Sequence, residues 1–234
     1  MPPGPPRGHA LQSATSRSIV LSGISTATGA LVTVEGIDGA GKSTQLELLA
    51  AHLRARGETV LTTREPGATP LGRELRRVLL RSEIALEPAA ELLLFLADRI
   101  QHVRGVIRPA LAAGTIVLCD RFSDSTIAYQ GYGREADLDR VARWDAESRD
   151  GIEADLTLLL DCPVAVALER RRRERDRYQS LDFVFHERVR AGFLALAAVA
   201  PQRIRRIDAT RDLETVSAEV VATVVAWLTA RSTP

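Results

Sequence analysis

The sequence has few cysteines, no long apolar run and no excess of either charge. Its two cysteines among 234 residues, Cys119 and Cys162, cannot make a disulfide framework, which favours a reducing cytoplasm. No stretch of about 18 apolar residues is present, so no segment is expected to span a membrane. The 31 basic and 30 acidic residues nearly cancel, which argues against a broad basic surface for nucleic acid. We therefore expect a cytoplasmic protein that binds neither membrane nor nucleic acid.

Lysine is almost missing from the chain. It occurs once, at Lys42, and every other basic side chain is arginine. The single lysine therefore indicates a position where arginine cannot substitute. A compact ammonium group fits a narrow loop around phosphate groups, whereas a planar guanidinium does not.

The chain divides into an N-terminal segment and one α/β domain. Residues 1–29 are rich in Pro, Gly, Ser, Thr and Ala and match a secretory signal poorly, so we expect a disordered or non-native extension. In residues 30–234, short apolar strands alternate with longer helical patterns, which indicates βαβ units and a parallel sheet. The expected strands are 31–35, 59–63, 115–119, 155–160 and 204–208. The expected helices are 42–56, 70–81, 88–113, 138–148, 163–175, 181–198 and 213–229.

A phosphate-binding loop follows the first expected strand. Residues 36–43, GIDGAGKS, match G-x-x-x-x-G-K-[ST] between a strand and a helix, where a glycine-rich turn that only caps the helix is the weaker interpretation. The residues expected to bind ATP are Gly36, Ile37, Asp38, Gly39, Ala40, Gly41, Lys42, Ser43 and Thr44. Lys42 is expected to bridge the β- and γ-phosphates, and the Ser43 hydroxyl to ligate Mg²⁺.

The third expected strand ends in Asp120 and Arg121. A carboxylate at the carboxyl end of a strand beside the P-loop suits a partner of Mg²⁺, and Arg121 would reach the same crevice to hold a phosphate. A P-loop alone does not separate a kinase from a GTPase switch or an ATP-driven machine, so the remaining motifs have to decide.

Two further motifs resemble one family. The first is TREPG at residues 63–67, and the second is DRFSDSTIAYQG at residues 120–131. With the P-loop and the closing IDA at residues 207–209, they resemble the thymidylate kinase family over nearly all of residues 31–229. The resemblance implies a P-loop nucleoside monophosphate kinase, a three-layer α/β sandwich with a central five-stranded parallel sheet in the order 2-3-1-4-5. It also implies a homodimer that transfers the γ-phosphate of ATP to dTMP with Mg²⁺, giving ADP and dTDP for dTTP synthesis.

Phe95 and Arg99 lie four residues apart on an expected helix, so both side chains reach one patch. The resemblance implies that Phe95 stacks on the thymine and that Arg99 hydrogen-bonds its carbonyl group. The alternative for Phe95 is core packing among neighbouring leucines. Arg99 on the same face weakens that alternative, because an unpaired buried guanidinium is costly.

The resemblance implies roles for other residues on the acceptor side. The residues implied to hold the acceptor phosphate are Arg64, Arg76 and Arg121, and those implied to read the base edge are Thr126 and Gln130. Glu65 falls in the same substrate-binding group. Asp38, inside the P-loop, corresponds to a carboxylate directed towards the acceptor sugar and the metal, and is counted with Lys42 and Arg121 among the catalytic residues.

The strongest charge run is RRRRERDR at residues 170–177. This run fits three interpretations: a solvated helix face, a nucleic-acid patch or a lid that closes over phosphates. Nucleic-acid binding favours aromatic residues between the basic ones, and this run has none. Phosphoryl transfer needs positive charge at the travelling group. Some thymidylate kinases place that arginine directly after the P-loop aspartate, where this chain has Gly39, so the chain resembles the subgroup with a lid arginine. With a lid around residues 170–182, the candidates are Arg172, Arg173, Arg175 and Arg177, of which Arg173 and Arg175 are taken as catalytic.

Two alternatives to this function stay open. One is a kinase for another monophosphate, such as dUMP or dGMP. The other is a P-loop switch that hydrolyses nucleotide slowly and signals through a partner. The arginines expected on the acceptor side favour a kinase, because a switch does not need a second anion site.

Lys42 provides the first test. We expect Lys42→Ala to abolish phosphoryl transfer with the fold intact, and Lys42→Arg to lose most activity because the guanidinium does not fit the loop. Steady-state turnover and thermal melting of both variants measure this. Full activity of the arginine variant would contradict the steric argument.

Overall fold

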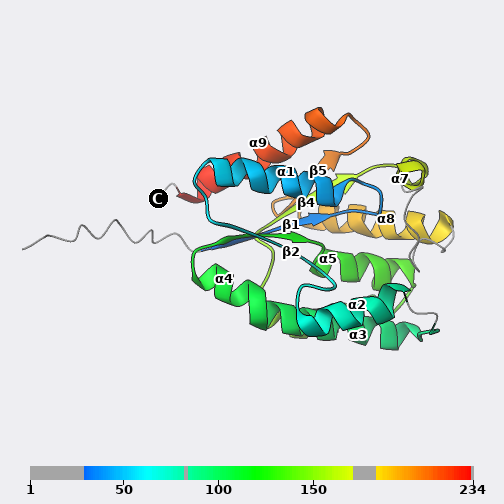
Figure 1. Cartoon of the computed structure of the whole chain (residues 1–234). Helices are drawn as coiled ribbons and strands as arrows, with labels where there is room; N and C mark the ends of the chain where they lie inside the picture. Colours follow the sequence, from blue (N-terminus) through cyan, green and yellow to red (C-terminus); the bar gives the residue numbers. More distant parts are fainter. Residues whose placement is uncertain (1–28, 82–83, 171–182, 233–234) are drawn as a thin grey trace, which may run out of the picture.

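The computed structural model describes residues 29–81, 84–170 and 183–232. Its centre is one parallel five-stranded sheet in the order β2-β3-β1-β4-β5 (Figure 1). The strands are β1 (Ala30–Glu35), β2 (Val60–Arg64), β3 (Ile116–Asp120), β4 (Leu156–Asp161) and β5 (Ile204–Asp208). The predicted sheet and strand order are therefore confirmed, with strand ends that differ from the predicted ones by at most one residue.

The central strands are apolar because helices cover both faces of the sheet. Every residue of β1 and β4 is buried, and in β3 only Asp120 is partly exposed. Val32, Leu118 and Leu158 are fully buried in the main core. Continuous apolar strands of this kind are typical of parallel sheets in α/β proteins.

Two helices, α1 and α9, lie on one face of the sheet, and the others named here lie on the opposite face or beside it, which makes three layers (Figure 1). The first two are α1 (Lys42–Ala55) and α9 (Leu213–Ser232). The remaining longer helices are α2 (Pro70–Arg81), α3 (Pro88–His102), α6 (Leu138–Arg149), α7 (Val164–Arg170) and α8 (Phe183–Val199). The helix predicted over 88–113 is present as α3 followed without a break by the π-helix η1 (Val103–Ile107) and α4 (Arg108–Ala112).

One helical segment was not predicted. It comprises α5 (Ser123–Thr126) and the π-helix η2 (Ile127–Gly133). Glycine and aromatic residues give this stretch a low helix propensity, so tertiary packing has to hold it. A Cβ on Gly133 would come within 2.7 Å of Val189 on α8, which shows how closely the two helices approach. Single-turn π-helices occur frequently at functional sites.

Helix α9 qualifies the expectation about membranes. Residues Leu213–Arg231 are long and apolar enough to cross a membrane by length and composition. Val216, Val220 and Val224, however, repeat every four residues and are buried in the main core. This spacing is that of a helix packed on a core by one face.

Some expectations fall outside the described residues. This group comprises residues 1–28 of the extension predicted over 1–29 and most of the lid, including Arg172, Arg173, Arg175 and Arg177. The helix predicted over 163–175 is present as α7 up to Arg170. The domain division and the lid therefore stay predictions.

Candidate active site at the carboxyl ends of the strands

The P-loop lies between β1 and α1, as predicted. Gly36 has φ 136°, and a Cβ there would come within 2.4 Å of the Leu160 carbonyl oxygen, so no other residue fits. Gly41 has φ 93° and immediately precedes the first turn of α1. The backbone N–H groups of such a loop and helix start are suited to bind an anion.

Lys42 is held inside this loop. Its side chain is 7% exposed, and Nζ donates to the Ile37 carbonyl oxygen at 3.0 Å and lies 3.8 Å from Asp38 Oδ1. Burial, with a further contribution from Arg121, lowers the pKa of Lys42 below its usual value. The enclosure of the ammonium group supports the steric argument made for this position.

Ser43 and Asp120 meet beside the loop. Ser43 Oγ donates to Asp120 Oδ2 at 2.7 Å. The other carboxylate oxygen, Oδ1, is buried without a hydrogen-bond partner. In the described part of the chain no group of three or more His, Cys, Asp or Glu side chains could hold a metal alone. A hydroxyl and one carboxylate suit Mg²⁺, which takes its other ligands from phosphates and water.

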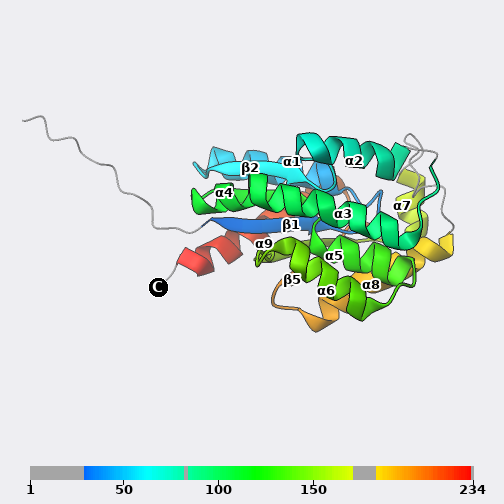
Figure 2. The same ribbon diagram turned by 90° about the horizontal axis from the view of Figure 1, so that it is seen from below.

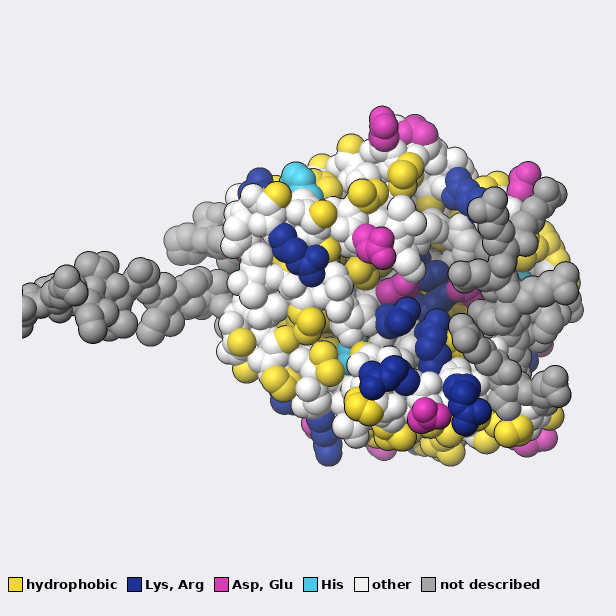
Figure 3. Space-filling model, viewed as in Figure 1, with side chains coloured by type: hydrophobic (Ala, Val, Ile, Leu, Met, Phe, Trp, Pro, Cys, Tyr) yellow, Lys and Arg dark blue, Asp and Glu magenta, His cyan; other side chains and the backbone are white. Residues whose placement is uncertain are grey.

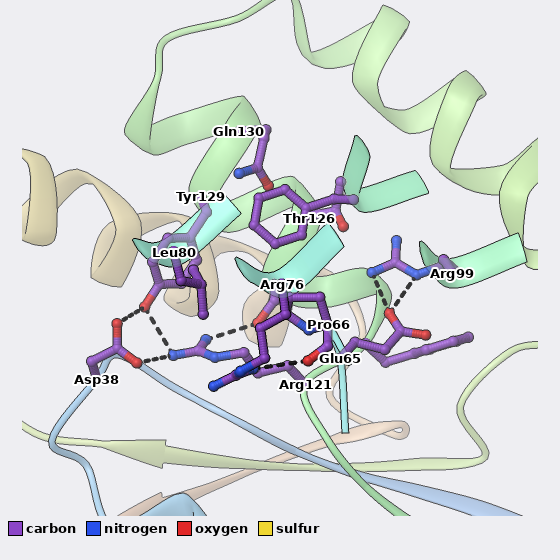
Figure 4. A pocket seen from close by; sticks show the side chains of 13 residues that line it. Asp38, Glu65, Pro66, Arg76, Leu80, Arg99, Arg121, Thr126, Tyr129 and Gln130 are labelled. Atoms are coloured by element: carbon purple, nitrogen blue, oxygen red, sulfur yellow. Dashed lines mark hydrogen bonds and ion pairs between the residues drawn. The ribbon is translucent and has the colours of Figure 1, made fainter. Parts of the chain in front are cut away.

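Arg121 lies where the P-loop meets the acceptor side. Its backbone has φ 71°, a left-handed conformation that costs about 1–3 kcal/mol in a non-glycine residue. Its guanidinium donates to Gly36 O at 3.2 Å and to Ser125 Oγ at 3.0 Å. It also donates to Tyr129 OH at 3.1 Å and forms an ion pair with Asp38 (Figure 4). Burial, the largest single effect, lowers the pKa of Arg121, but Asp38, Tyr129, Asp120 and Glu35 together outweigh it and raise that pKa well above its usual value. Arg121 therefore stays charged.

A pocket opens next to Arg121, with about 580 Å³ of space including its mouth. It is lined by Asp38, Glu65, Pro66, Arg76, Leu80, Phe95, Arg99, Arg121, Phe122, Ser125, Thr126, Tyr129 and Gln130 (Figure 4). Basic side chains gather around a hollow on the face of the molecule shown in Figure 3, with acidic side chains among them. The pocket thus combines an apolar wall with several cationic groups, which suits a nucleotide.

Arg99 is the most deeply buried cation of the pocket, with its side chain 2% exposed. Glu65 accepts from its Nε at 2.8 Å, and Asp145 on α6 forms a second ion pair with it. Glu65 also bonds His102 Nδ1 at 2.9 Å, and His102 Nε2 lies 2.7 Å from Thr63 Oγ1. Burial, the largest single effect, raises the pKa of Glu65, but Arg99 and His102 together outweigh it and lower that pKa. Glu65, predicted to bind substrate, lines the pocket and also fixes Arg99.

The remaining predicted substrate residues are distributed unevenly. Phe95, Thr126 and Gln130 line the pocket with Arg76, whose guanidinium donates to the Pro66 carbonyl oxygen at 2.8 Å. Arg64 ends β2 as an exposed residue and is not among the lining residues. The structure therefore brings all but one of them to a single pocket.

Sequence reasoning missed several residues of the site. Tyr129 donates to Asp38 at 3.2 Å, and its ring centroid lies 4.8 Å from the Arg121 guanidinium carbon. Glu91 is buried and accepts from both Gln130, at 3.3 Å, and Arg134, at 2.8 Å. His102 lies three residues after Arg99, and residues three apart on a helix are neighbours. This spacing was a sequence signal that His102 lies beside Arg99.

Comparisons with known proteins agree on one family. The family model described as thymidylate kinase matches residues 34–220. A thymidylate kinase from Desulfovibrio desulfuricans is 50% identical over 210 residues, covering 86% of this chain and 97% of the relative. One from Deinococcus radiodurans is 49% identical over 198 residues, covering 84% and 96%. The crystal structure of thymidylate kinase from Ehrlichia chaffeensis matches with a TM-score of 0.70 and 36% identity, covering 84% of this chain and 98% of that one.

Phe95 provides a test of the pocket. Its neighbours Leu92 and Leu96 are buried in a core cluster, whereas Phe95 is half-buried and lines the pocket. We expect Phe95→Ala to raise KM for dTMP about ten- to a hundredfold with KM for ATP unchanged, because base stacking contributes about 1–3 kcal/mol. Arg99→Ala should act in the same direction.

Steady-state kinetics and thermal melting of Phe95→Ala separate stacking from core packing. A core role predicts a stability loss of about 3–5 kcal/mol with no selectivity between the two substrates. A collapsed melting temperature with a fixed ratio of the two Michaelis constants would contradict the stacking role.

Proposed function

Because the chain belongs to the thymidylate kinase family, we propose that it transfers the γ-phosphate of ATP to dTMP, giving ADP and dTDP. The observation that carries this proposal is the ion pair between Asp38 of the P-loop and Arg121 at the edge of the acceptor pocket. It brings a phosphate-binding loop and a second cationic pocket into direct contact. A donor and an acceptor nucleotide bound there would have their phosphates side by side.

The donor phosphates would lie in the P-loop. Backbone N–H groups and the start of α1 hold the β-phosphate, and Lys42 reaches the β- and γ-phosphates. Mg²⁺ held by Ser43 and Asp120 would supply charge neutralisation across these phosphates. The partnerless Oδ1 of Asp120 supports this assignment.

The acceptor would lie in the adjoining pocket. Arg121 and Arg76, which line the pocket, would contact its phosphate, and the family pattern adds Arg64 as a third arginine. The thymine would stack on Phe95, with Arg99 donating to a carbonyl oxygen and Thr126 and Gln130 at the base edge. Arg99 is suited to this because Glu65 and Asp145 fix the orientation of its guanidinium.

Positioning and charge neutralisation would carry the reaction. The attacking oxygen of dTMP is already ionised at neutral pH, so an in-line displacement at the γ-phosphorus does not need a general base. Arg121 would neutralise charge between the two nucleotides, and Asp38 would orient Arg121. Since Gly39 leaves the P-loop without an arginine, we assign the missing positive charge to the lid, with Arg173 and Arg175 as candidates.

A homodimer is proposed as well. Leu93 and Ile100 of α3 are 51% and 41% exposed and lie seven residues apart, so they share one face of the helix. Helices α3 and α6 lie side by side, which makes a broad surface (Figure 2). Sedimentation at assay concentrations distinguishes a dimer from a monomer.

The proposed acceptor is tested by titrating nucleoside monophosphates at fixed Mg-ATP and following ADP release. We expect dTMP to give a higher kcat/KM than dGMP, because the pocket offers a donor for a pyrimidine carbonyl. We expect a higher kcat/KM than for dUMP, because the apolar lining can bury the 5-methyl group that dUMP lacks. Slow ADP release that does not respond to any monophosphate would support the switch instead. A preference for dGMP or dUMP over dTMP would contradict the assigned acceptor.

A further inference from the structure

Glu35 is a fully buried carboxylate at the end of β1 that has no role in the reaction described above. Its Oε1 accepts from the backbone N–H of Phe122 at 2.7 Å, and its Oε2 accepts from Ser125 Oγ at 2.6 Å. Neither partner carries a charge. A buried carboxylate without a charged partner costs folding free energy unless other interactions compensate it. A functional role would explain why Glu35 is present.

Both hydrogen bonds lead to Arg121. Phe122 directly follows Arg121 in the chain, and the bond to its N–H holds the backbone where φ is 71°. Ser125 Oγ, which donates to Glu35, accepts from the Arg121 guanidinium at 3.0 Å. On the other side, the Arg121 N–H donates to the Val34 carbonyl oxygen at 3.1 Å. Glu35 therefore acts on both the backbone and the side chain of one residue.

We propose that Glu35 is a positioning residue that holds Arg121 at the junction of the donor and acceptor sites, acting through Ser125 and the Phe122 N–H. The inference rests on the proposed role of Arg121 in phosphoryl transfer. Glu35 does not line the acceptor pocket, whereas Ser125 does.

The charge on Glu35 is what the relay needs. A hydrogen-bonded chain runs from the Arg121 N–H to Ser125 Oγ and from the Ser125 O–H to the carboxylate, which ends it as an acceptor. Glutamine has the same shape, but its NH₂ group takes the place of Oε1 or Oε2 and so faces one of the two donors, the Phe122 N–H or the Ser125 O–H, without accepting from it. Glu35→Gln therefore breaks the relay without opening a cavity.

Burial, and next the Asp124 carboxylate, raise the pKa of Glu35 from 4.5 to about 7. Six charged or titratable groups interact electrostatically with Glu35: Arg121 and Asp124 near the end of β3, Lys42 on α1, Arg99 on α3, Arg203 before β5, and Cys119. Because the folded-state pKa is raised, the stability of the fold falls as the pH rises from about 4.5 to about 7 and keeps the lower value above pH 7. Glutamine removes that cost, so the variant should melt no lower than the wild type at pH 8.

The test compares kcat, both Michaelis constants and the melting temperature of wild type, Glu35→Gln, Ser125→Ala and the double variant. We expect Glu35→Gln to lower kcat about ten- to a hundredfold, the range for losing a hydrogen bond to a charged acceptor, with KM for Mg-ATP unchanged. Ser125→Ala should lower kcat in the same direction. The double variant should lose less than the product of the two effects, because both residues belong to one relay.

The pH profile adds a readout that a purely structural role would not move. The ratio of wild-type to Glu35→Gln kcat cancels the titration of the substrate phosphates. We expect this ratio to rise from pH 6 to pH 8, as the carboxylate ionises through about 7. A flat ratio would overturn the proposal.

Asp155→Asn is the matched control. Asp155 Oδ2 accepts from the Leu31 N–H at 2.8 Å, at the other end of β1 and away from the site. This variant should keep the kcat of the wild type. An unchanged kcat in Glu35→Gln, a loss explained by unfolding, or effects that multiply in the double variant would overturn the inference. An inactive wild type would instead refute the proposed function, and the two failures are thus distinguished.

Discussion

The contact on which the site depends is the ion pair between Asp38 and Arg121. Its position follows from the sheet, because β1 and β3 are neighbours and pair with Val34 opposite Asp120. The P-loop begins where β1 ends, and Arg121 follows the last residue of β3. Parallel pairing therefore puts the P-loop and Arg121 at the carboxyl ends of neighbouring strands, and no long-range contact between side chains is needed for this. This is the usual place for ligands in open α/β sheets.

Charged groups at this edge are buried in connected sets. Glu35 holds the turn that carries Arg121, and Glu65 holds Arg99 with the help of His102. Each carboxylate orients a guanidinium that is proposed to meet the substrate. Removing one member of such a buried set is more costly than the net stabilisation the set provides, because it leaves its partner desolvated. Preorganised cations of this kind stabilise developing charge without reorganising during the reaction.

Much of the fold could be predicted from the sequence because local signals were strong. Apolar runs predicted the three central strands, β1, β3 and β4, most clearly, whereas the outer strand β5 (IRRID) has only two apolar residues. The P-loop followed from its motif. The helix of Ser123–Gly133 was missed because its stability comes from α8 and not from its own residues. Glu35 and Asp145 were missed because their partners are remote in sequence, as in the 90 positions between Glu35 and Ser125. Periodicity cannot reveal such pairs.

The proposed mechanism of phosphoryl transfer depends most on Arg121 acting between the two nucleotides. Replacing it by lysine keeps one positive charge but loses the fork that contacts Asp38, Ser125 and Gly36 together. The direct measurement is the single-turnover rate of phosphoryl transfer in Arg121→Lys with both substrates saturating. We predict that this rate falls at least about a hundredfold, which is the effect of losing a preorganised donor at developing charge, and that the melting curve is unchanged. A single-turnover rate equal to that of the wild type would contradict it.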